Sequence, residues 1–91
     1  MTWLARVHVV LKPVVNDPQG EAILGGLKSL AFQSVGQVRA GKYFEIRLDA
    51  ASHSDAERLV DDMCRKLLAN PVIEDYRIAV EREATTMRDA V

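Results

Sequence analysis

The chain has 91 residues, 48% of them hydrophobic, and its 12 basic and 13 acidic residues leave a formal net charge of −1. We expect one domain over residues 1–91, with no nucleic-acid or anionic-membrane partner, because neither sign of charge dominates. No apolar run approaches the roughly 20 residues of a membrane span, the N-terminus has no signal-peptide pattern and a single cysteine excludes an internal disulfide, so a cytoplasmic protein is expected.

Residues 3–12, WLARVHVVLK, alternate between apolar and polar side chains. Every second residue from Ala5 to Leu11 is apolar, whereas Arg6, His8 and Lys12 fall on the other side. This period of two predicts a half-buried strand. Pro13 ends the strand because proline has no N–H to donate.

The stretch NDPQGEAILGGLKSLAF predicts a helix with Asp17 as N-cap and Pro18 as its first residue. Gly25 and Gly26 each cost about 1 kcal/mol relative to alanine in a helix interior. Two interpretations stay open: the glycines are merely tolerated, or they allow close approach to the sheet or to another backbone. The expected apolar face consists of Ile23, Leu27 and Leu30.

The stretch VGQVRAGKYFEIRLDA predicts a strand over residues 43–49, with Phe44, Ile46 and Leu48 facing inward. Residues 35–39 predict a shorter strand. A tight hairpin turn at 40–42, in which Gly41 has a positive φ, joins it to the strand at 43–49. The alternative is one long strand with a glycine bulge at Gly41.

Residues 52–70, SHSDAERLVDDMCRKLLAN, form the clearest helical pattern. Ser54 and Glu57 have capping-box spacing, and Asn70-Pro71 ends the helix. Cys64 is expected to be a small buried residue beside the apolar stripe. That stripe consists of Ala56, Leu59, Val60, Met63 and Leu67.

The segment VIEDYRIAVE predicts a last strand with Tyr76, Ile78 and Val80 on one face, and residues 82–91 form a short helical turn or fray. The order is therefore strand, helix, strand, strand, helix, strand. We expect an α+β fold: a two-layer sandwich in which two helices cover one face of a mainly antiparallel sheet.

Patterns for nucleotide and metal binding fail on spacing. GEAILGGLKS is not a phosphate loop, because Leu27 stands where that motif needs glycine before Lys28. A closed zinc site wants four ligands, whereas His8 and His53 are far apart in sequence and there is no second cysteine. We expect no metal-binding and no cofactor-binding residue.

Catalytic patterns are equally weak. Ser52, His53 and Asp55 are adjacent, but adjacency in sequence is not triad geometry, and a loop entering a capped helix explains them more simply. Tyr43 is the one candidate for stacking on an RNA base, and acidic residues share its face. We therefore expect no catalytic residue in this chain.

Three segments stand out beside these patterns: LKPVVNDPQGEAI (11–23), VRAGKYFEI (38–46) and CRKLLANPVIEDYRI (64–78). Together, in this order and spacing, they resemble the PurS family, the small subunit of phosphoribosylformylglycinamidine synthase. The family carries Lys-Pro then Asp-Pro-Gln-Gly, next Val-Arg-x-Gly-Lys, and last Leu-Leu-Ala-Asn-Pro-Val-Ile-Glu-Asp-Tyr. The resemblance extends to about Val80, and Gly25-Gly26 and Val14 look like departures.

The resemblance implies a role in purine biosynthesis. The enzyme, an ATP-dependent carbon–nitrogen ligase, makes formylglycinamidine ribonucleotide from formylglycinamide ribonucleotide and glutamine. Its large synthetase subunit (PurL) amidates, its glutaminase subunit (PurQ) releases ammonia, and the complex uses ATP and Mg. The PurS-like subunit binds no cofactor, forms a dimer or tetramer by exchange of a helix-and-strand segment, and bridges the other two subunits to support ammonia transfer.

The polar residues of the first two resembling segments are the candidate partner interface. Arg39 offers a planar fork of donors suited to a carboxylate, and Lys42 offers a mobile charge. The alternative for each residue is a solvated hairpin, and the alternative for the whole chain is a small-molecule sensor of the ACT type. The candidate residues are Lys12, Asp17, Gln19, Arg39, Gly41, Lys42 and Tyr43.

Overall fold

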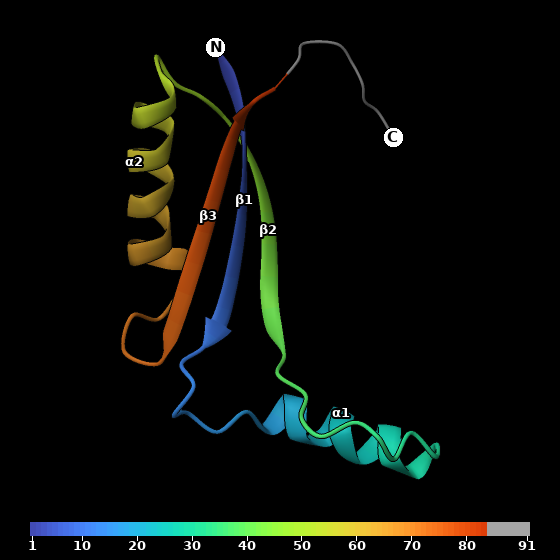
Figure 1. Ribbon diagram of the computed structural model, residues 1–91. Coiled ribbons are helices and arrows are strands. Elements are labelled where there is room, and N and C mark those ends of the chain that lie inside the picture. The colour runs from blue at the N-terminus through green and yellow to red at the C-terminus, as the bar shows by residue number, and fades with distance from the viewer. Residues whose placement is uncertain (84–91) are drawn as a thin grey trace.

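A three-stranded antiparallel sheet with one helix on its face forms the body of the molecule (Figure 1). The computed structural model describes residues 1–83, so the expectations for the tail lie largely outside the described residues. The sheet order is β2-β1-β3, with β1 pairing antiparallel to both neighbours, which confirms the α+β class. The elements are β1 (Thr2–Leu11), α1 (Pro18–Ser29), β2 (Gly41–Asp49), α2 (His53–Met63), a π-helical turn (Cys64–Leu68) and β3 (Glu74–Arg82).

The core lies between the sheet and α2. Ala5, Val7 and Val9 of β1 are fully buried, as their alternation predicts, and they meet Val60 and Cys64 of the second helical segment. Cys64 is thus the small core residue that was expected. The inward residues of the outer strands pack around this centre: Phe44, Ile46, Leu48, Tyr76, Ile78 and Val80.

Helix α2 begins two residues earlier than its capping pattern predicts. Ser52 is the N-cap, and its Oγ accepts the Asp55 N–H at 3.1 Å, so the assignment of the cap to Ser54 is wrong. The apolar stripe is also narrower, since Leu59 is exposed and Leu67 is 84% exposed. Leu67 lies in the π-helical turn, whose wider winding rotates side chains off the stripe of the α-helix.

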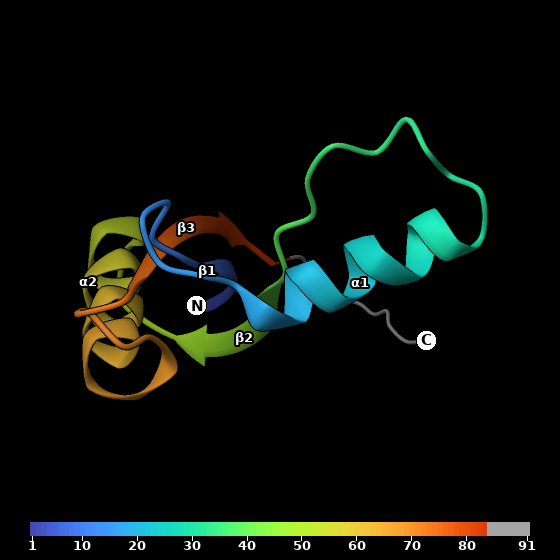
Figure 2. The same ribbon diagram turned by 90° about the horizontal axis from the view of Figure 1, so that it is seen from below.

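Helix α1 starts where the sequence predicts but does not lie on the sheet. Asp17 caps the helix and Pro18 is its first residue, yet Gly20 is the only residue of α1 that is buried. The helix extends away from the sheet (Figures 1 and 2). The Cα radius of gyration is 16.9 Å, against roughly 12 Å for a compact chain of this length. The expectation of two helices on one face is therefore wrong: among residues 1–83, α2 is the one helix that packs on the sheet, against β3 and β1. Helix α1 meets the rest of the described chain at its base, where Gly20 lies against Val38, so its apolar residues do not reach the sheet.

The predicted short strand at residues 35–39 is wrong as well, because residues 35–40 are irregular and β2 begins at Gly41. The segment leads from the end of α1 directly into β2 and does not turn back along the outer edge of β2 to form the expected hairpin. Gly41 is neither a bulge nor a turn residue: it pairs regularly with Val10, and no described glycine has a positive φ. The positive φ, 75°, belongs to Ala31, just after α1.

The role of glycine in this chain depends on how much room a side chain would have, since no described glycine has a positive φ. A Cβ on Gly41 would lie 2.5 Å from the Val9 carbonyl oxygen of the neighbouring strand, which explains why only glycine fits. A Cβ on Gly25 or Gly26 would meet nothing within 4 Å. Close approach of these two glycines to the sheet is thus wrong, and approach to another backbone stays a prediction.

Candidate functional site

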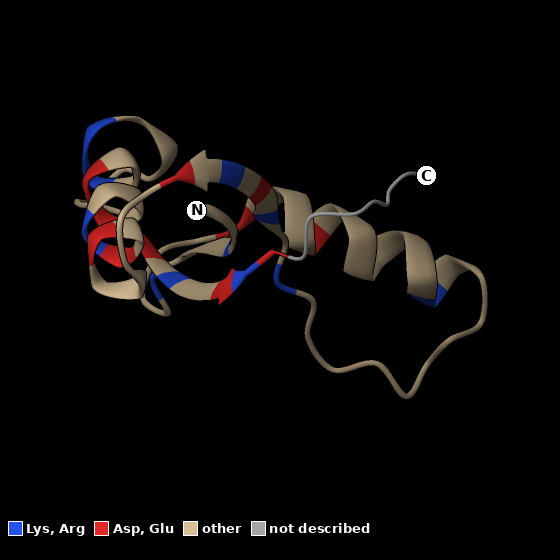
Figure 3. Ribbon diagram, turned by 90° about the horizontal axis from the view of Figure 1, so that it is seen from above, with Lys and Arg blue, Asp and Glu red and all other residues tan. Residues whose placement is uncertain are grey.

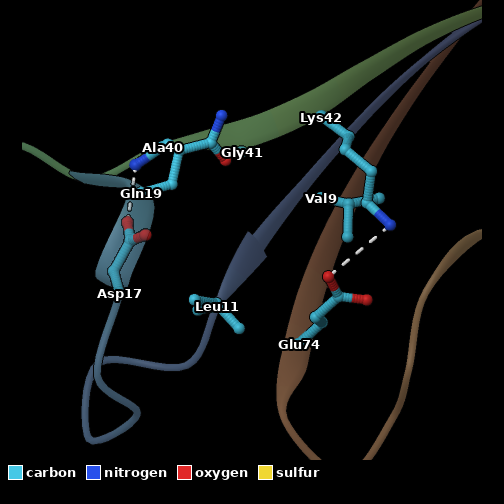
Figure 4. Close-up of a pocket in the computed structure, with 8 residues that line it drawn as sticks. All are labelled: Val9, Leu11, Asp17, Gln19, Ala40, Gly41, Lys42 and Glu74. Atoms are coloured by element: carbon cyan, nitrogen blue, oxygen red, sulfur yellow. Dashed lines mark hydrogen bonds and ion pairs between the residues drawn. The ribbon is translucent and has the colours of Figure 1, made fainter. Parts of the chain in front are cut away.

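A pocket opens at the end of the sheet where β1 stops and where β2 and β3 begin (Figure 4). Its volume is about 180 Å³, and the first turn of α1 closes one side. Four of the seven candidate interface residues meet there, with Gln19 supplied by α1 and Gly41 by β2. The lining consists of Val9, Leu11, Asp17, Gln19, Ala40, Gly41, Lys42 and Glu74.

Asp17 is a buried cross-link in this pocket, only 3% exposed. Its Oδ1 accepts the Gly20 N–H at 2.9 Å, which caps α1, and its Oδ2 accepts the Ala40 N–H at 2.7 Å. These backbone donors, Gly20 first and Ala40 next, lower the pKa of Asp17 below its ordinary value because they favour the charged carboxylate. Asp17 therefore joins the two ends of the α1 segment.

Arg39 makes a second cross-link at the same place. Its Nη1 donates to the Val15 carbonyl at 3.1 Å, and its Nη2 donates to the carbonyls of Lys12 at 3.0 Å and Leu11 at 3.3 Å. The fork is thus engaged with backbone oxygens of its own chain, so Arg39 has a structural role that the sequence did not indicate. Its removal is expected to cost stability.

The two lysines pair with β3. Lys12 Nζ lies 2.8 Å from Asp75 Oδ1, and Lys42 Nζ lies 3.6 Å from Glu74 Oε2 (Figure 4). The Lys42 side chain is 54% exposed, and such surface pairs contribute about 0–1 kcal/mol to stability. Both lysines can therefore turn to a partner at little cost. Sequence reasoning missed Glu74, because only the β1–β3 register places it opposite Leu11.

Tyr43 lies apart from the pocket, on the sheet face that α2 leaves uncovered. Its ring centroid is 4.8 Å from that of His8, the residue opposite it on β1, and its hydroxyl donates to Glu45 Oε2 at 2.9 Å. Burial first and the Glu45 carboxylate second raise the pKa of the Tyr43 hydroxyl. The candidate residues thus divide between two places.

The residues that resemble a catalytic triad do not form one. Ser52 Oγ caps α2 by accepting the Asp55 N–H, and His53 Nε2 lies 2.9 Å from the Val80 carbonyl oxygen. Within residues 1–83, no cluster of three or more histidine, cysteine or acidic side chains is arranged to hold a metal ion. In the same range no helix is long and apolar enough to span a membrane.

Asp17→Asn is expected to make the free energy of unfolding depend less on pH in the acid range. The lowered pKa means that the unfolded chain binds a proton first as the pH falls. The contribution of Asp17 is therefore complete above about pH 4 and is lost as the pH falls through the lowered pKa. Urea midpoints, followed by circular dichroism across this range, should separate wild type and Asp17→Asn at neutral pH and converge in acid. Asp62→Asn on the α2 surface is the control, and a gap that does not change with pH would contradict the expectation.

Comparison with known proteins identifies relatives over most of the chain. Residues 4–82 match the family model PurS, described as phosphoribosylformylglycinamidine (FGAM) synthase. The PurS subunit of phosphoribosylformylglycinamidine synthase from Bacillus subtilis is 50% identical over 79 residues, covering 87% of this chain and 93% of the relative. The Synechocystis subunit is 48% identical over 75 residues, covering 82% of this chain and 75% of the relative.

Solved structures agree with the sequence relatives. Bacillus subtilis PurS superposes with a TM-score of 0.80 at 48% identity, covering 88% of this chain and 99% of that chain. A PurLQS structure from Thermotoga maritima contains a chain that matches with a TM-score of 0.82 at 28% identity, covering 89% of this chain and 99% of that chain. These findings agree with the resemblance seen in the three segments and give no support to the ACT-type alternative.

Proposed function

The chain belongs to the PurS family, and from this premise we propose that it is the small, non-catalytic subunit of a phosphoribosylformylglycinamidine synthase. In that role it serves de novo purine biosynthesis, as part of an ATP-dependent ligase with glutamine as amide donor. The observation that carries the proposal is the family match over residues 4–82, which extends from β1 through β3.

Within the enzyme, the chain joins a PurL-type synthetase subunit to a PurQ-type glutaminase subunit and supports the passage of ammonia between them. The Thermotoga maritima PurLQS structure, which contains a matching chain, supports this assignment of partners. ATP and Mg²⁺ belong to the partner subunits in this proposal, and the complex works in the cytoplasm. Lys12, Gln19 and Lys42 are the candidate residues most open to a partner, because their side chains hold no backbone in place.

The subunit acts as a dimer or tetramer. The support comes from residues 18–38, the arm, which comprises α1 and the irregular segment after it. Leu30 is 70% exposed and Phe32 54%, and Glu21 and Lys28 are its only charged residues. The arm is accordingly almost free of charge colours in Figure 3. An arm of this composition is expected to be buried against protein.

Reconstitution tests the proposal. The chain is titrated into separately purified synthetase and glutaminase subunits, and complex formation is followed by analytical ultracentrifugation beside glutamine-dependent and ammonia-dependent amidation. We expect glutamine-dependent activity to require the chain, and ammonia-dependent activity to depend on it less. The chain alone should neither hydrolyse ATP nor deamidate glutamine. Robust turnover by the pure chain, or full glutamine-dependent activity of the two other subunits without it, would refute the proposal.

A further inference from the structure

We propose that Arg39 and Asp17 form a clasp that fixes the direction of the arm relative to the sheet. The arm leaves the body after β1 and returns at β2, and its two ends lie side by side at the pocket (Figures 1 and 4). The role in assembly rests on the proposed function, whereas the clasp itself is a property of the isolated chain.

The hydrogen bonds of the clasp join two segments: residues 11–17, which lead out to the arm, and residues 39–40, which return from it. Arg39, on the returning side, donates to three carbonyl oxygens of residues 11–15 on the outgoing side, at 3.0 to 3.3 Å. Asp17, on the outgoing side, accepts the Ala40 N–H on the returning side at 2.7 Å. All four bonds therefore run from donors on the returning side to acceptors on the outgoing side, and each side contributes one of the two side chains.

Gly20 allows the two sides to come this close. A Cβ at this position would overlap the Val38 carbonyl oxygen and lie 2.7 Å from Asp17 Oδ2. Gly20 is also the only buried residue of α1, so the contact at the base is where the helix meets the rest of the chain. The clasp is thus closely fitted as well as hydrogen-bonded.

Little else constrains the arm. Within residues 1–83, α2 packs on β3 and β1, whereas α1 makes no extended contact with any strand or with α2. A helix of 12 residues is about 18 Å long, so a small rotation at its base moves its far end by several ångströms. The clasp bonds are therefore placed where they control the position of Leu30 and Phe32 most strongly.

A fixed arm favours assembly. If only a fraction of the chains hold the arm in the direction that the oligomer needs, the apparent affinity of self-association is the intrinsic affinity multiplied by that fraction. Arg39 and Asp17 act as positioning residues in this scheme: they touch backbone rather than a partner. The guanidinium suits the task because its rigid planar fork reaches several oxygens at once, which a lysine ammonium cannot do in the same geometry.

The direct test is the spread of arm positions. Spin labels are placed on Ser29→Cys at the far end of α1 and on Lys66→Cys in the body, both exposed sites. Native Cys64 is fully buried, so brief labelling modifies the introduced cysteines. Labelled chain is diluted with excess unlabelled chain, so that pulsed electron resonance reads distances within one molecule. The labelled background is combined with Arg39→Ala, with Arg39→Gln as a milder second variant, and with Arg47→Gln as the control.

We expect one narrow distance distribution for the background and for Arg47→Gln, and a distribution about twice as wide for both Arg39 variants. The affinity of self-association, measured by sedimentation velocity, should fall about tenfold in the Arg39 variants. Distributions as narrow as the background in both Arg39 variants would overturn the clasp. A wider distribution with unchanged affinity would overturn its role in assembly. Failure of the unmodified chain to bind the other subunits would instead refute the proposed function, and the distance result would stand.

Discussion

Gly20→Ala is expected to lower the melting temperature by about 10 °C, whereas Gly25→Ala in the same helix should raise it by a few degrees. An added methyl at position 20 overlaps the Val38 carbonyl oxygen, and forced overpacking costs about 1–3 kcal/mol. At position 25 the same methyl meets nothing within 4 Å, and alanine is better than glycine in a helix by about 1 kcal/mol. The two substitutions add the same methyl group to the same helix, so a loss of stability at position 20 with a gain at position 25 reports the difference in local space.

Differential scanning calorimetry of both variants and wild type, at one protein concentration, measures this difference. Gly26→Ala, whose Cβ also meets nothing, provides a second control. Equal melting temperatures for Gly20→Ala and wild type would show that the base of the arm yields easily, against the close fit inferred here. A lower value for Gly25→Ala would mean that another backbone packs on that side of α1 in the oligomer.

The double substitution Leu30→Glu with Phe32→Glu is expected to convert the oligomer to a monomer. Both side chains are more than half exposed in the single chain, so charge there costs the monomer little. Burial of unpaired carboxylates in an interface costs several kcal/mol, and each 1.4 kcal/mol is a factor of ten in affinity. The self-association constant should therefore fall by several orders of magnitude, with the sheet retained.

Sedimentation velocity at about micromolar concentration measures the association state, and circular dichroism checks the fold. The matched control is Leu67→Glu with Val72→Glu, a still more exposed apolar pair that follows the C-terminal end of α2. The control should stay oligomeric if the arm forms the interface. A monomeric wild type, or an oligomer that survives the arm substitutions, would contradict the assignment of the arm.

The sequence alone determined the elements whose signals lie within a few neighbouring residues. The alternation of Val7 and Val9 identifies β1 and its buried face, because side chains on a strand point to opposite faces in turn. The pair Asp17-Pro18 marks the start of α1, because a cap and a first-turn proline act within one helical turn. The three family segments similarly identify the family, and with it the proposed function, without any coordinates.

Only the tertiary structure decided what lies next to these elements. Residues 35–39 have the composition of a strand but lie in the irregular return from α1 to β2, and α1 packs along no strand of the described sheet. Arg39 suggested a partner interface because sequence shows a donor without showing which carbonyl oxygens lie 3.0 to 3.1 Å from it. Gly41 suggested a turn because glycine permits both a positive φ and a close approach, and only the position of the Val9 carbonyl oxygen decides between them. Local patterns fix which way a side chain faces, and the packing of distant segments fixes what it meets.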